Sequence, residues 1–222
     1  KWTWAANATI SFNVQGLTAS AQTLARIAFQ LWDDASNLSF VETTSGGNIT
    51  LDDLKSGAYG GPSGTSISGQ VNSWRITSGS INVQQNWSGE ATPGPDSYTL
   101  QTFLHEIGHA LGMGHSGDYK TTTNWADGLY ANDTWQYSVM SYHDQSHFDG
   151  GSYRYVKTPM IADLLYMQQV YGAPTDTRAG ATVYGFNSNA GTYEGFKLYD
   201  FASYTKSPAF TIFDSAGKDT LD

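Results

Sequence analysis

Apolar and polar residues near the start of the chain follow a pattern that predicts a mixed sheet. Residues 8–14 (ATISFNV) alternate with a period of two, which is typical of a strand with one buried face. Residues 21–37 carry apolar side chains at helical spacing and predict an amphipathic helix that packs on the sheet. Its apolar stripe consists of Leu24, Ile27, Ala28, Leu31 and Trp32. Residues 38–42 and 48–51 predict two more strands, and this order indicates an α/β fold.

The rest of the pattern predicts two strands and two helices. Residues 66–71 (SISGQV) carry a weak strand signal and residues 81–85 (INVQQ) a stronger one. A helix is expected to follow residue 97, with Asp96 or Ser97 as its N-cap. Residues 158–172 predict a second helix, with a threonine cap, a proline in the first turn and a glycine at the end. Its core face is expected at Ile161, Leu164, Leu165 and Gln168.

The composition changes near residue 175. Beyond this point Gly, Thr, Asn and Asp dominate, and the apolar segments are short. We therefore expect a first domain in residues 1–175 and a β-rich segment in residues 176–222. The whole chain has 222 residues, which is enough for a substantial core.

Charge and cysteine content exclude several functions. The formal net charge is -9, and the 11 Lys and Arg residues are dispersed, which argues against a nucleic-acid partner. No apolar run approaches the ~20 residues that span a bilayer. The chain has no cysteine, so a disulfide framework and thiolate metal ligands are excluded. Together with 24 Gly, 14 Tyr and 7 Trp, this composition fits a rigid extracellular protein in which bound calcium could replace disulfides.

The segment TLQTFLHEIGHALGMGHSGDY holds three of the five histidines in the pattern H-E-x-x-H-x-x-G-x-x-H. His105 and His109 are one helical turn apart, so they share a face and can bind one metal ion. Gly112 can end the helix in a left-handed conformation, after which His115 can reach the same ion. Three neutral nitrogen ligands with one open position are typical of catalytic zinc. The motif therefore predicts a hydrolytic zinc site.

This motif and the later S-V-M-S-Y segment together resemble the metzincin zinc peptidases, and within them the serralysin family. Met140 matches the methionine of the Met-turn, and Tyr142 matches a tyrosine that serralysins supply as an additional zinc ligand. Ser116 stands where serralysins usually have proline and is matrixin-like. His143 stands where serralysins often have tryptophan. Matrixins lack the tyrosine after the Met-turn, so Tyr142 favours the serralysins.

The resemblance implies a metzincin domain with a twisted, mixed five-stranded sheet, an active-site helix and a C-terminal helix. Residues 176–222 would be a short β-rich segment that leads towards a calcium-binding β-roll. No G-G-x-G-x-D repeat occurs in the chain. A truncated chain, an autolysed product and a natural short form are all compatible with this.

The resemblance also implies a secreted, bacterial zinc metalloendopeptidase that cleaves proteins with broad specificity. The zinc ligands would be His105, His109, His115 and Tyr142. Glu106 would act as general base on a water molecule. Tyr142 would also swing away with substrate and stabilise the oxyanion, so it counts as catalytic. Met140 would form an apolar floor below the imidazoles, and Gly112 would shape the turn.

Calcium and substrate sites follow from the same resemblance. The all-oxygen calcium shell would come from the carbonyls of Arg178, Gly180, Thr182 and Ala216 and the carboxylates of Asp214 and Asp219. Metzincins hold an extended peptide against an edge strand. The family pattern places this strand at Ser66, Ile67, Ser68, Gly69, Gln70 and Val71. Backbone bonds would carry most of the recognition.

The expected partners are an extended polypeptide substrate and a proteinaceous inhibitor, and the chain is expected to be a monomer. A matrixin-like metalloprotease is one alternative. Another is a catalytically silent calcium-binding or adhesion fragment on a metzincin scaffold. Loss of Glu106 or of one histidine would favour the silent fragment, and none of these residues is lost.

Overall fold

The computed structural model describes residues 1–87, 94–117, 119, 124–125, 129–148 and 150–222. Its helices are α1 (Ala19–Ala35), α2 (Tyr98–Ala110) and α3 (Ile161–Tyr171), with short 3-10 turns η2 (Gln145–His147) and η3 (Phe201–Ser203). Its strands are β1 (Trp2–Thr3), β2 (Thr9–Gly16), β3 (Ser39–Glu42), β4 (Ile49–Asp52), β5 (Ala58–Ser66), β6 (Trp74–Val83), β7 (Val183–Tyr184) and β8 (Thr220–Leu221). The element order confirms an α/β fold.

The main sheet is mixed, and one of its edges is antiparallel. Strands β3, β2, β4 and β6 are neighbours in that order and run parallel. Strand β5 pairs antiparallel with the other edge of β6, and the two-residue β1 extends the sheet at the start of β6. The predicted five strands are therefore present, with β1 as a sixth. Among the described residues, strand β5 pairs only with β6, so its outer edge has no strand partner there.

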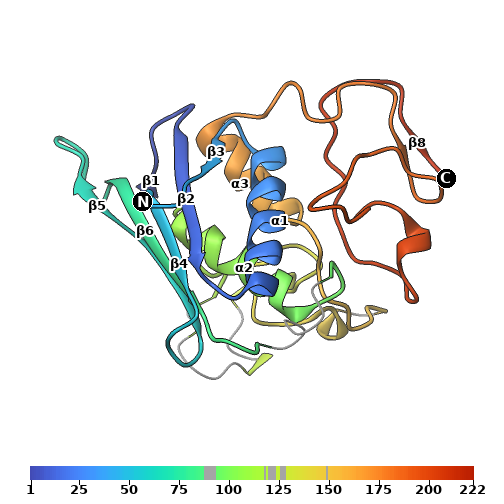
Figure 1. Ribbon diagram of the computed structural model, residues 1–222, viewed down its shortest axis with the longest axis horizontal. Helices are drawn as coiled ribbons and strands as arrows, with labels where there is room; N and C mark the ends of the chain where they lie inside the picture. The colour runs from blue at the N-terminus through green and yellow to red at the C-terminus, as the bar shows by residue number, and fades with distance from the viewer. Residues whose placement is uncertain (88–93, 118, 120–123, 126–128, 149) are drawn as a thin grey trace.

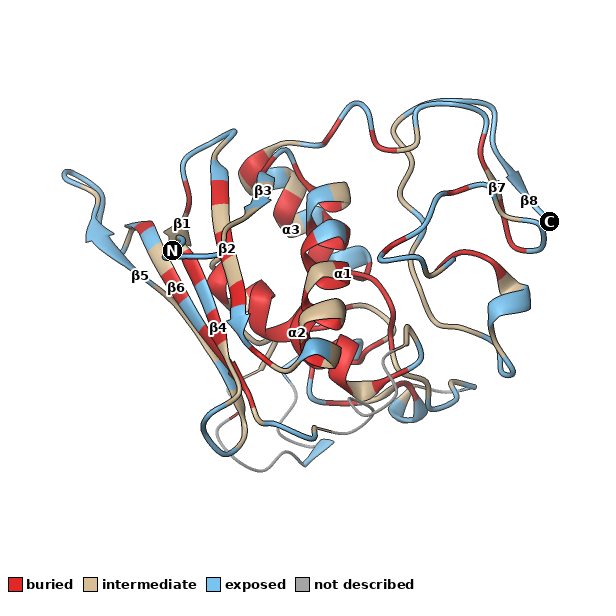
Figure 2. Cartoon of the chain, viewed as in Figure 1, coloured by how far each residue is buried: buried red, intermediate tan, exposed pale blue. Residues whose placement is uncertain are grey.

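All three helices lie on one side of this sheet (Figure 1). The predicted stripe of α1 is confirmed, since all five of its residues are buried. The rings of Phe12 in β2 and Phe29 in α1 stack with centroids 4.0 Å apart. Figure 2 shows that the buried residues gather where the helices meet the sheet. The most deeply buried helix is α2, which packs between α1 and strands β5 and β6.

The predicted position of the edge strand was wrong. The strand covers Ala58–Ser66, while residues 67–73 form the loop of the β5–β6 hairpin. Ser66 is the single residue of the predicted segment that lies in the strand. The sequence of β5, AYGGPSGTS, has almost no apolar alternation, because this strand is held by backbone pairing with β6. Pro62 is tolerated because β5 is an edge strand.

The predicted core face of α3 was wrong in part: Leu164 is buried as predicted, but Ile161 and Leu165 are not. Ile161 and Leu165 are 47% and 64% exposed, and the buried face is formed by Leu164, Met167 and Tyr171. The helix starts at residue 161 rather than at the predicted threonine and proline, because Asp163 accepts a hydrogen bond from the Met160 amide at 2.7 Å. A buried carboxylate at the third helical position thus fixes both the start and the register.

Residues beyond 173 form the small parallel β7–β8 sheet and long connections (Figure 1). They join the first part through Arg178, whose guanidinium pairs with Asp34 at the end of α1 at 2.5 Å. Lys157 donates its amide to the carbonyl of Ala209 at 3.0 Å. The division at residue 175 stays a prediction. No helix in the described part of the chain is long and apolar enough to cross a membrane.

Candidate active site

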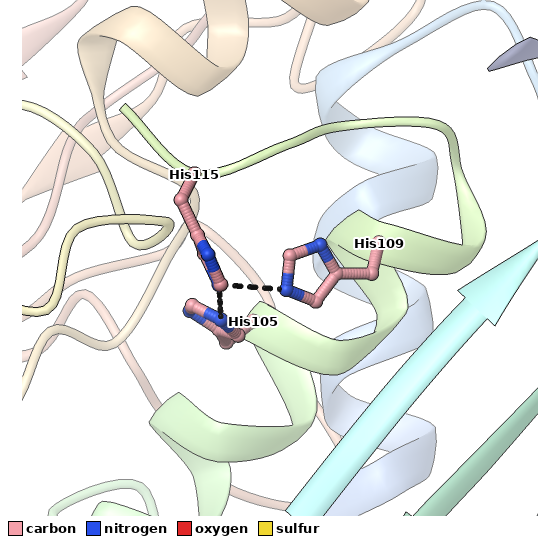
Figure 3. A group of neighbouring side chains, drawn as sticks. All are labelled: His105, His109 and His115. Atoms are coloured by element: carbon pink, nitrogen blue, oxygen red, sulfur yellow. Dashed lines mark hydrogen bonds between the residues drawn. The ribbon is translucent and has the colours of Figure 1, made fainter. Parts of the chain in front are cut away.

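Helix α2 carries the first half of the site. It begins after Ser97, whose hydroxyl accepts the amide of Leu100 at 3.2 Å, as one of the two predicted caps should. His105 and His109 are on one face of the helix, and Figure 3 shows their imidazoles turned towards that of His115. The helix is buried almost all round, and its buried residues include polar side chains such as Gln101, His105 and Glu106.

Gly112 redirects the chain at the end of α2. Its φ is +96°, and a Cβ at this position would lie 2.2 Å from the carbonyl oxygen of Trp2. Two tyrosines of α3 hold the turn: Tyr171 donates to the carbonyl of Leu111 at 2.6 Å and Tyr166 donates to that of Gly112 at 3.0 Å. These contacts fix the direction in which the chain leaves α2, and the chain then returns so that His115 faces the two helical histidines.

Three imidazole nitrogens converge on one point. His115 Nε2 lies 3.1 Å from His105 Nε2 and 3.0 Å from His109 Nε2 (Figure 3). Nitrogens bound to one tetrahedral zinc ion at ~2.05 Å lie about 3.3 Å apart, so the spacing fits such an ion. His105 Nδ1 donates to the carbonyl of Val139 at 2.8 Å, and His109 Nδ1 donates to that of Met113 at 2.9 Å. These bonds leave both Nε2 lone pairs free for a metal.

Burial keeps the triad neutral. It lowers the pKa of His105 to about 3 and that of His115 to about 4, and it also lowers the pKa of His109. The neighbouring imidazoles add to the effect at His105 and His115, because two positive rings repel each other. Neutral rings are the form that binds a metal ion.

Glu106 lies beside the triad with one carboxylate oxygen unpartnered. Burial raises its pKa to about 8, while a hydrogen bond from the Gly60 backbone opposes the rise. Among the described residues, its Oε2 atom is buried and has no hydrogen-bond partner. A divalent cation held by the histidines would lower this pKa, because a nearby positive charge favours the carboxylate. The group is therefore suited to hold and release a proton.

Met140 is buried against helix α2. Its side chain is 1% exposed, and a Cβ on Gly108 would come within 2.6 Å of its sulfur. Gly108 lies in the last turn of α2, between the two helical histidines, so the absence of a side chain there lets Met140 pack against the helix. The Met140 side chain thus occupies the space beside Gly108 in the part of the helix that carries His105 and His109.

Asp163 fixes the segment that contains Met140. Its carboxylate is fully buried and accepts the Ser138 hydroxyl at 2.6 Å and the Val139 amide at 2.8 Å. The carbonyl of the same Val139 accepts the bond from His105. A continuous chain of hydrogen bonds therefore leads from α3 to the first histidine of the triad.

Tyr142 stands over the triad and is 41% exposed. Its ring centroid lies 4.4 Å from that of His115 and 5.5 Å from that of His105. On its other side it stacks on Tyr119, with centroids 5.0 Å apart and planes 16° apart. The structure thus brings Tyr142 next to two of the three histidines.

A cavity of about 250 Å³ opens beside Glu106 and His105. Four aromatic side chains, from two tryptophans and two tyrosines, form part of its wall, and Glu106 is the one acidic residue among the described residues that line it. It is lined by Ala58, Trp87, Tyr98, Gln101, Thr102, His105, Glu106, Trp135, Val139, Ser141 and Tyr142. The Trp87 indole donates to the Thr102 hydroxyl at 3.0 Å, and the amide of Val156 donates to Gln101 Oε1 at 2.9 Å, so parts of the wall are held in place.

Sequence reasoning missed several residues of this site. Gly108, Asp163 and Tyr119 act through contacts between segments that are far apart in the sequence, and so do the aromatic residues of the cavity. The glycine inside the predicted helix was one available signal, since a glycine there costs helix stability unless packing needs it.

The six predicted calcium residues lie in two adjacent segments. The Thr182 hydroxyl is 3.2 Å from the carbonyl oxygen of Arg178 and 3.3 Å from that of Gly180. The Thr182 amide donates to Asp219 at 3.0 Å. In the second segment, Asp214 accepts the amide of Ala216 at 3.1 Å. The structure thus places Asp219 against the first segment, while the second oxygen of Asp214 accepts the Tyr184 hydroxyl at 2.6 Å.

Comparison with known proteins places the chain in a family. The model for matrixins, peptidase M10, matches residues 3–126, which is more than half of the chain. A second model, the serralysin C-terminal region of peptidase M10, matches residues 173–222. The chain belongs to the serralysin-type M10 metallopeptidases. This confirms the predicted resemblance and decides against a plain matrixin, despite Ser116.

Curated relatives support the serralysin assignment. Metallopeptidase AprA of Pseudomonas marginalis is 36% identical over 92% of this chain and 44% of its own length. Serralysin of Proteus mirabilis is 35% identical over 89% of the chain and 43% of its own length. Serralysin C of Dickeya chrysanthemi is 36% identical over 89% and 42%. This serralysin-type chain thus spans less than half the length of these relatives.

A solved structure supports the fold. The structure of myroilysin is similar with a TM-score of 0.50 and 18% identity, over 78% of this serralysin-type chain and 83% of that one. At this identity the likeness concerns the fold alone. It agrees with the predicted metzincin architecture.

Proposed function

We propose that this chain is the catalytic part of a zinc endopeptidase that hydrolyses peptide bonds in proteins with broad specificity. The proposal rests on one observation: three neutral imidazole nitrogens converge beside a buried, unpartnered carboxylate oxygen of Glu106. A buried acceptor without a partner indicates a proton-transfer role or a missing ligand. Three nitrogen ligands with an open side fit catalytic rather than structural zinc.

Each residue of the site has a role in this proposal. A bound zinc ion would supply Lewis acidity to the scissile carbonyl and to water. Glu106 takes a proton from the attacking water and returns it to the leaving amine. Tyr142 would be a further ligand of the bound metal in the absence of substrate, and its hydroxyl would donate to the oxyanion once it is released. Asp163 and Met140 keep the imidazoles in place, the first through Val139 and the second by packing.

The open edge of β5 supports the proposal that a substrate binds there in an extended conformation. This edge has backbone groups that do not pair within the sheet, and β5 runs beside α2. We propose that the substrate adds a strand here, so the binding residues shift from the predicted segment 66–71 to Ala58–Ser66. Backbone pairing is largely independent of side chains, which agrees with broad specificity.

The cavity next to Glu106 supports a preference at one substrate position. An aromatic wall of this size suits a large apolar side chain on the leaving-group side of the scissile bond. In a peptide series that varies this position, Phe or Leu should exceed Asp or Glu about 10- to 200-fold in kcat/KM. Equal rates across the series would contradict the assignment of the cavity, although they would leave the hydrolytic proposal standing.

Casein hydrolysis with and without a zinc chelator tests the activity. We expect cleavage by the untreated protein, loss with the chelator and recovery when Zn²⁺ is added in slight excess. A protein that is folded, contains zinc and still leaves casein intact would favour the silent scaffold. Activity that survives complete removal of zinc would contradict the mechanism.

We also propose a structural calcium ion at the two C-terminal segments. Six oxygen-bearing residues, Arg178, Gly180, Thr182, Asp214, Ala216 and Asp219, supply enough ligands for its usual shell of six to eight. At 100 times the dissociation constant, calcium should stabilise the fold by about 2.7 kcal/mol. Thermal unfolding with Ca²⁺ and with EGTA, at constant zinc, measures this. Identical midpoints would contradict the proposal, and Asp219→Asn should abolish any difference.

Three further predictions concern the localisation of the protein, its oligomeric state and an inhibitor. The relatives are bacterial, and the chain is acidic and free of cysteine, which supports a secreted bacterial protein. A monomeric state and inhibition by a protein that blocks the cleft stay predictions. Sedimentation of the zinc-loaded chain would test the first of these.

A further inference from the structure

Tyr119 stands at the centre of an aromatic cluster on the exposed side of the triad. It is 8% exposed, although it follows the third histidine by only four residues and belongs to a loop. Its ring stacks on Tyr142 with a 5.0 Å centroid distance and lies 5.5 Å from His115 and 5.3 Å from His143. A loop tyrosine that is buried against two residues of the site calls for a physical explanation.

The turn after His115 is built around this ring. A Cβ on Gly117 would lie 2.6 Å from Tyr119 Cε1 and 2.9 Å from its Cζ. The ring therefore rests directly on the Gly117 backbone, and a side chain at Gly117 would displace it. The same ring thus contacts the segment that carries His115 and the face of Tyr142.

The hydroxyl group of Tyr119 makes no hydrogen bond to the described residues. Among the described residues, its oxygen is buried and has no hydrogen-bond partner. A buried hydroxyl without a partner destabilises the folded protein, so removing it should not weaken the fold. The function of this side chain is therefore expected to lie in its aromatic face.

We propose that Tyr119 is a positioning residue that acts through stacking: it holds Tyr142 over the triad and closes the turn that carries His115. The inference rests on the proposed role of Tyr142 as a metal ligand. Stacked aromatic pairs contribute enough that loss of the ring should lower the ratio of metal-bound to free Tyr142 about 2- to 12-fold. Tyr119→Phe keeps the face and should keep the ratio. Tyr119→Leu removes the face and should lower it.

Copper replacement gives a readout that does not depend on peptidase activity. The full chain is stripped of zinc and loaded with Cu²⁺, and the tyrosinate-to-copper charge-transfer absorption is recorded. We expect the band in the unaltered chain and in Tyr119→Phe, and its absence in Tyr142→Phe. Tyr119→Leu should bind one copper ion but show a weaker band. Tyr130→Leu, at a side chain that is 61% exposed, is the matched control and should leave the band unchanged.

Gly117→Ala provides a second route to the same contact, in case Tyr119→Leu fails to fold. It retains the tyrosine but pushes its ring away, so the band should also weaken. Tyr119→Phe should keep the band and should raise the thermal midpoint slightly, because it removes a buried hydroxyl without a partner among the described residues.

The outcomes separate this inference from the proposed function. A normal band in folded Tyr119→Leu and Gly117→Ala would overturn the role of Tyr119 and leave that of Tyr142 intact. A loss in Tyr119→Phe equal to that in Tyr119→Leu would overturn stacking as the cause. Absence of the band in the unaltered chain would overturn the ligand role of Tyr142, and with it this inference, while the hydrolytic activity is tested separately with casein.

Discussion

Replacing Gly108 by alanine has two opposite effects on the free energy of unfolding: a gain in helix propensity and a larger loss from overpacking. In a helix interior, Gly→Ala alone should stabilise the protein by about 1 kcal/mol. Here the new Cβ would lie 2.6 Å from the sulfur of Met140, which is about 0.9–1.4 Å inside the usual contact of ~3.5–4.0 Å. Overpacking of a full core costs about 1–3 kcal/mol, and so close an approach indicates the upper part of that range. We therefore expect Gly108→Ala to destabilise the protein by about 1–2 kcal/mol.

A double-mutant cycle isolates the cause. Met140→Ala removes the sulfur and should itself cost about 2–5 kcal/mol through the cavity it creates. In that background the same Gly108→Ala change meets no sulfur and should stabilise by about 1 kcal/mol. The sign of the glycine effect should thus reverse, with a coupling of about 2–3 kcal/mol.

Urea unfolding of all four proteins, free of zinc and at fixed calcium, measures the cycle. Zinc is then titrated into each folded protein, because displacement of Met140 should also disturb the imidazoles above it and weaken binding. If Gly108→Ala stabilised the protein with Met140 present, or if the effect did not depend on Met140, the packing explanation for Gly108 would be refuted.

Two other residues give predictions of their own. Gly112→Ala should lower the free energy of unfolding by at least about 2 kcal/mol and weaken zinc binding, since the φ of Gly112 is +96° and a Cβ would collide with the carbonyl of Trp2. Gly114→Ala is the control, because nothing lies within 4 Å of the new Cβ among the described residues, and its free energy of unfolding should stay within about 0.5 kcal/mol of the unaltered protein. Burial raises the pKa of Asp163 to about 6, so the folded protein binds an extra proton between pH 4 and pH 6. The contribution of this proton to the free energy of unfolding is present below pH 4 and is lost as the pH rises through 6, by roughly 3 kcal/mol. In urea unfolding at pH 4 to 8, Asp163→Asn should therefore flatten the dependence of the free energy of unfolding on pH. An unchanged slope in the variant would exclude Asp163 as the source of this dependence.

The sequence predicted those parts of the site that depend on local spacing. Two histidines one turn apart and a glycine that ends the helix follow from helical geometry, and the structure places His105, His109 and His115 together. Met140 and Tyr142 are distant in sequence, and only the family resemblance linked them to the triad. The stripe of α1 was predictable because one face packs on the sheet.

Other parts could not be predicted because their causes are tertiary. Strand β5 is held by its pairing with β6, so its glycines, proline and serines carry no strand pattern of their own. The register of α3 depends on Asp163, which a polarity pattern assigns to the surface but which bonds to Ser138 and Val139. Gly108 and Gly117 are explained by side chains that approach from other segments.

The most direct test of the central claim compares Glu106→Gln with the unaltered chain for zinc content and casein hydrolysis in the same preparation. One zinc ion per chain is expected in both proteins, and the rate of the variant should be reduced about 10²- to 10⁴-fold, because the general base is lost while the ligands remain. Comparable hydrolysis by the two proteins, or no zinc bound to the folded unaltered chain, would contradict the role of Glu106 in a zinc-dependent hydrolysis.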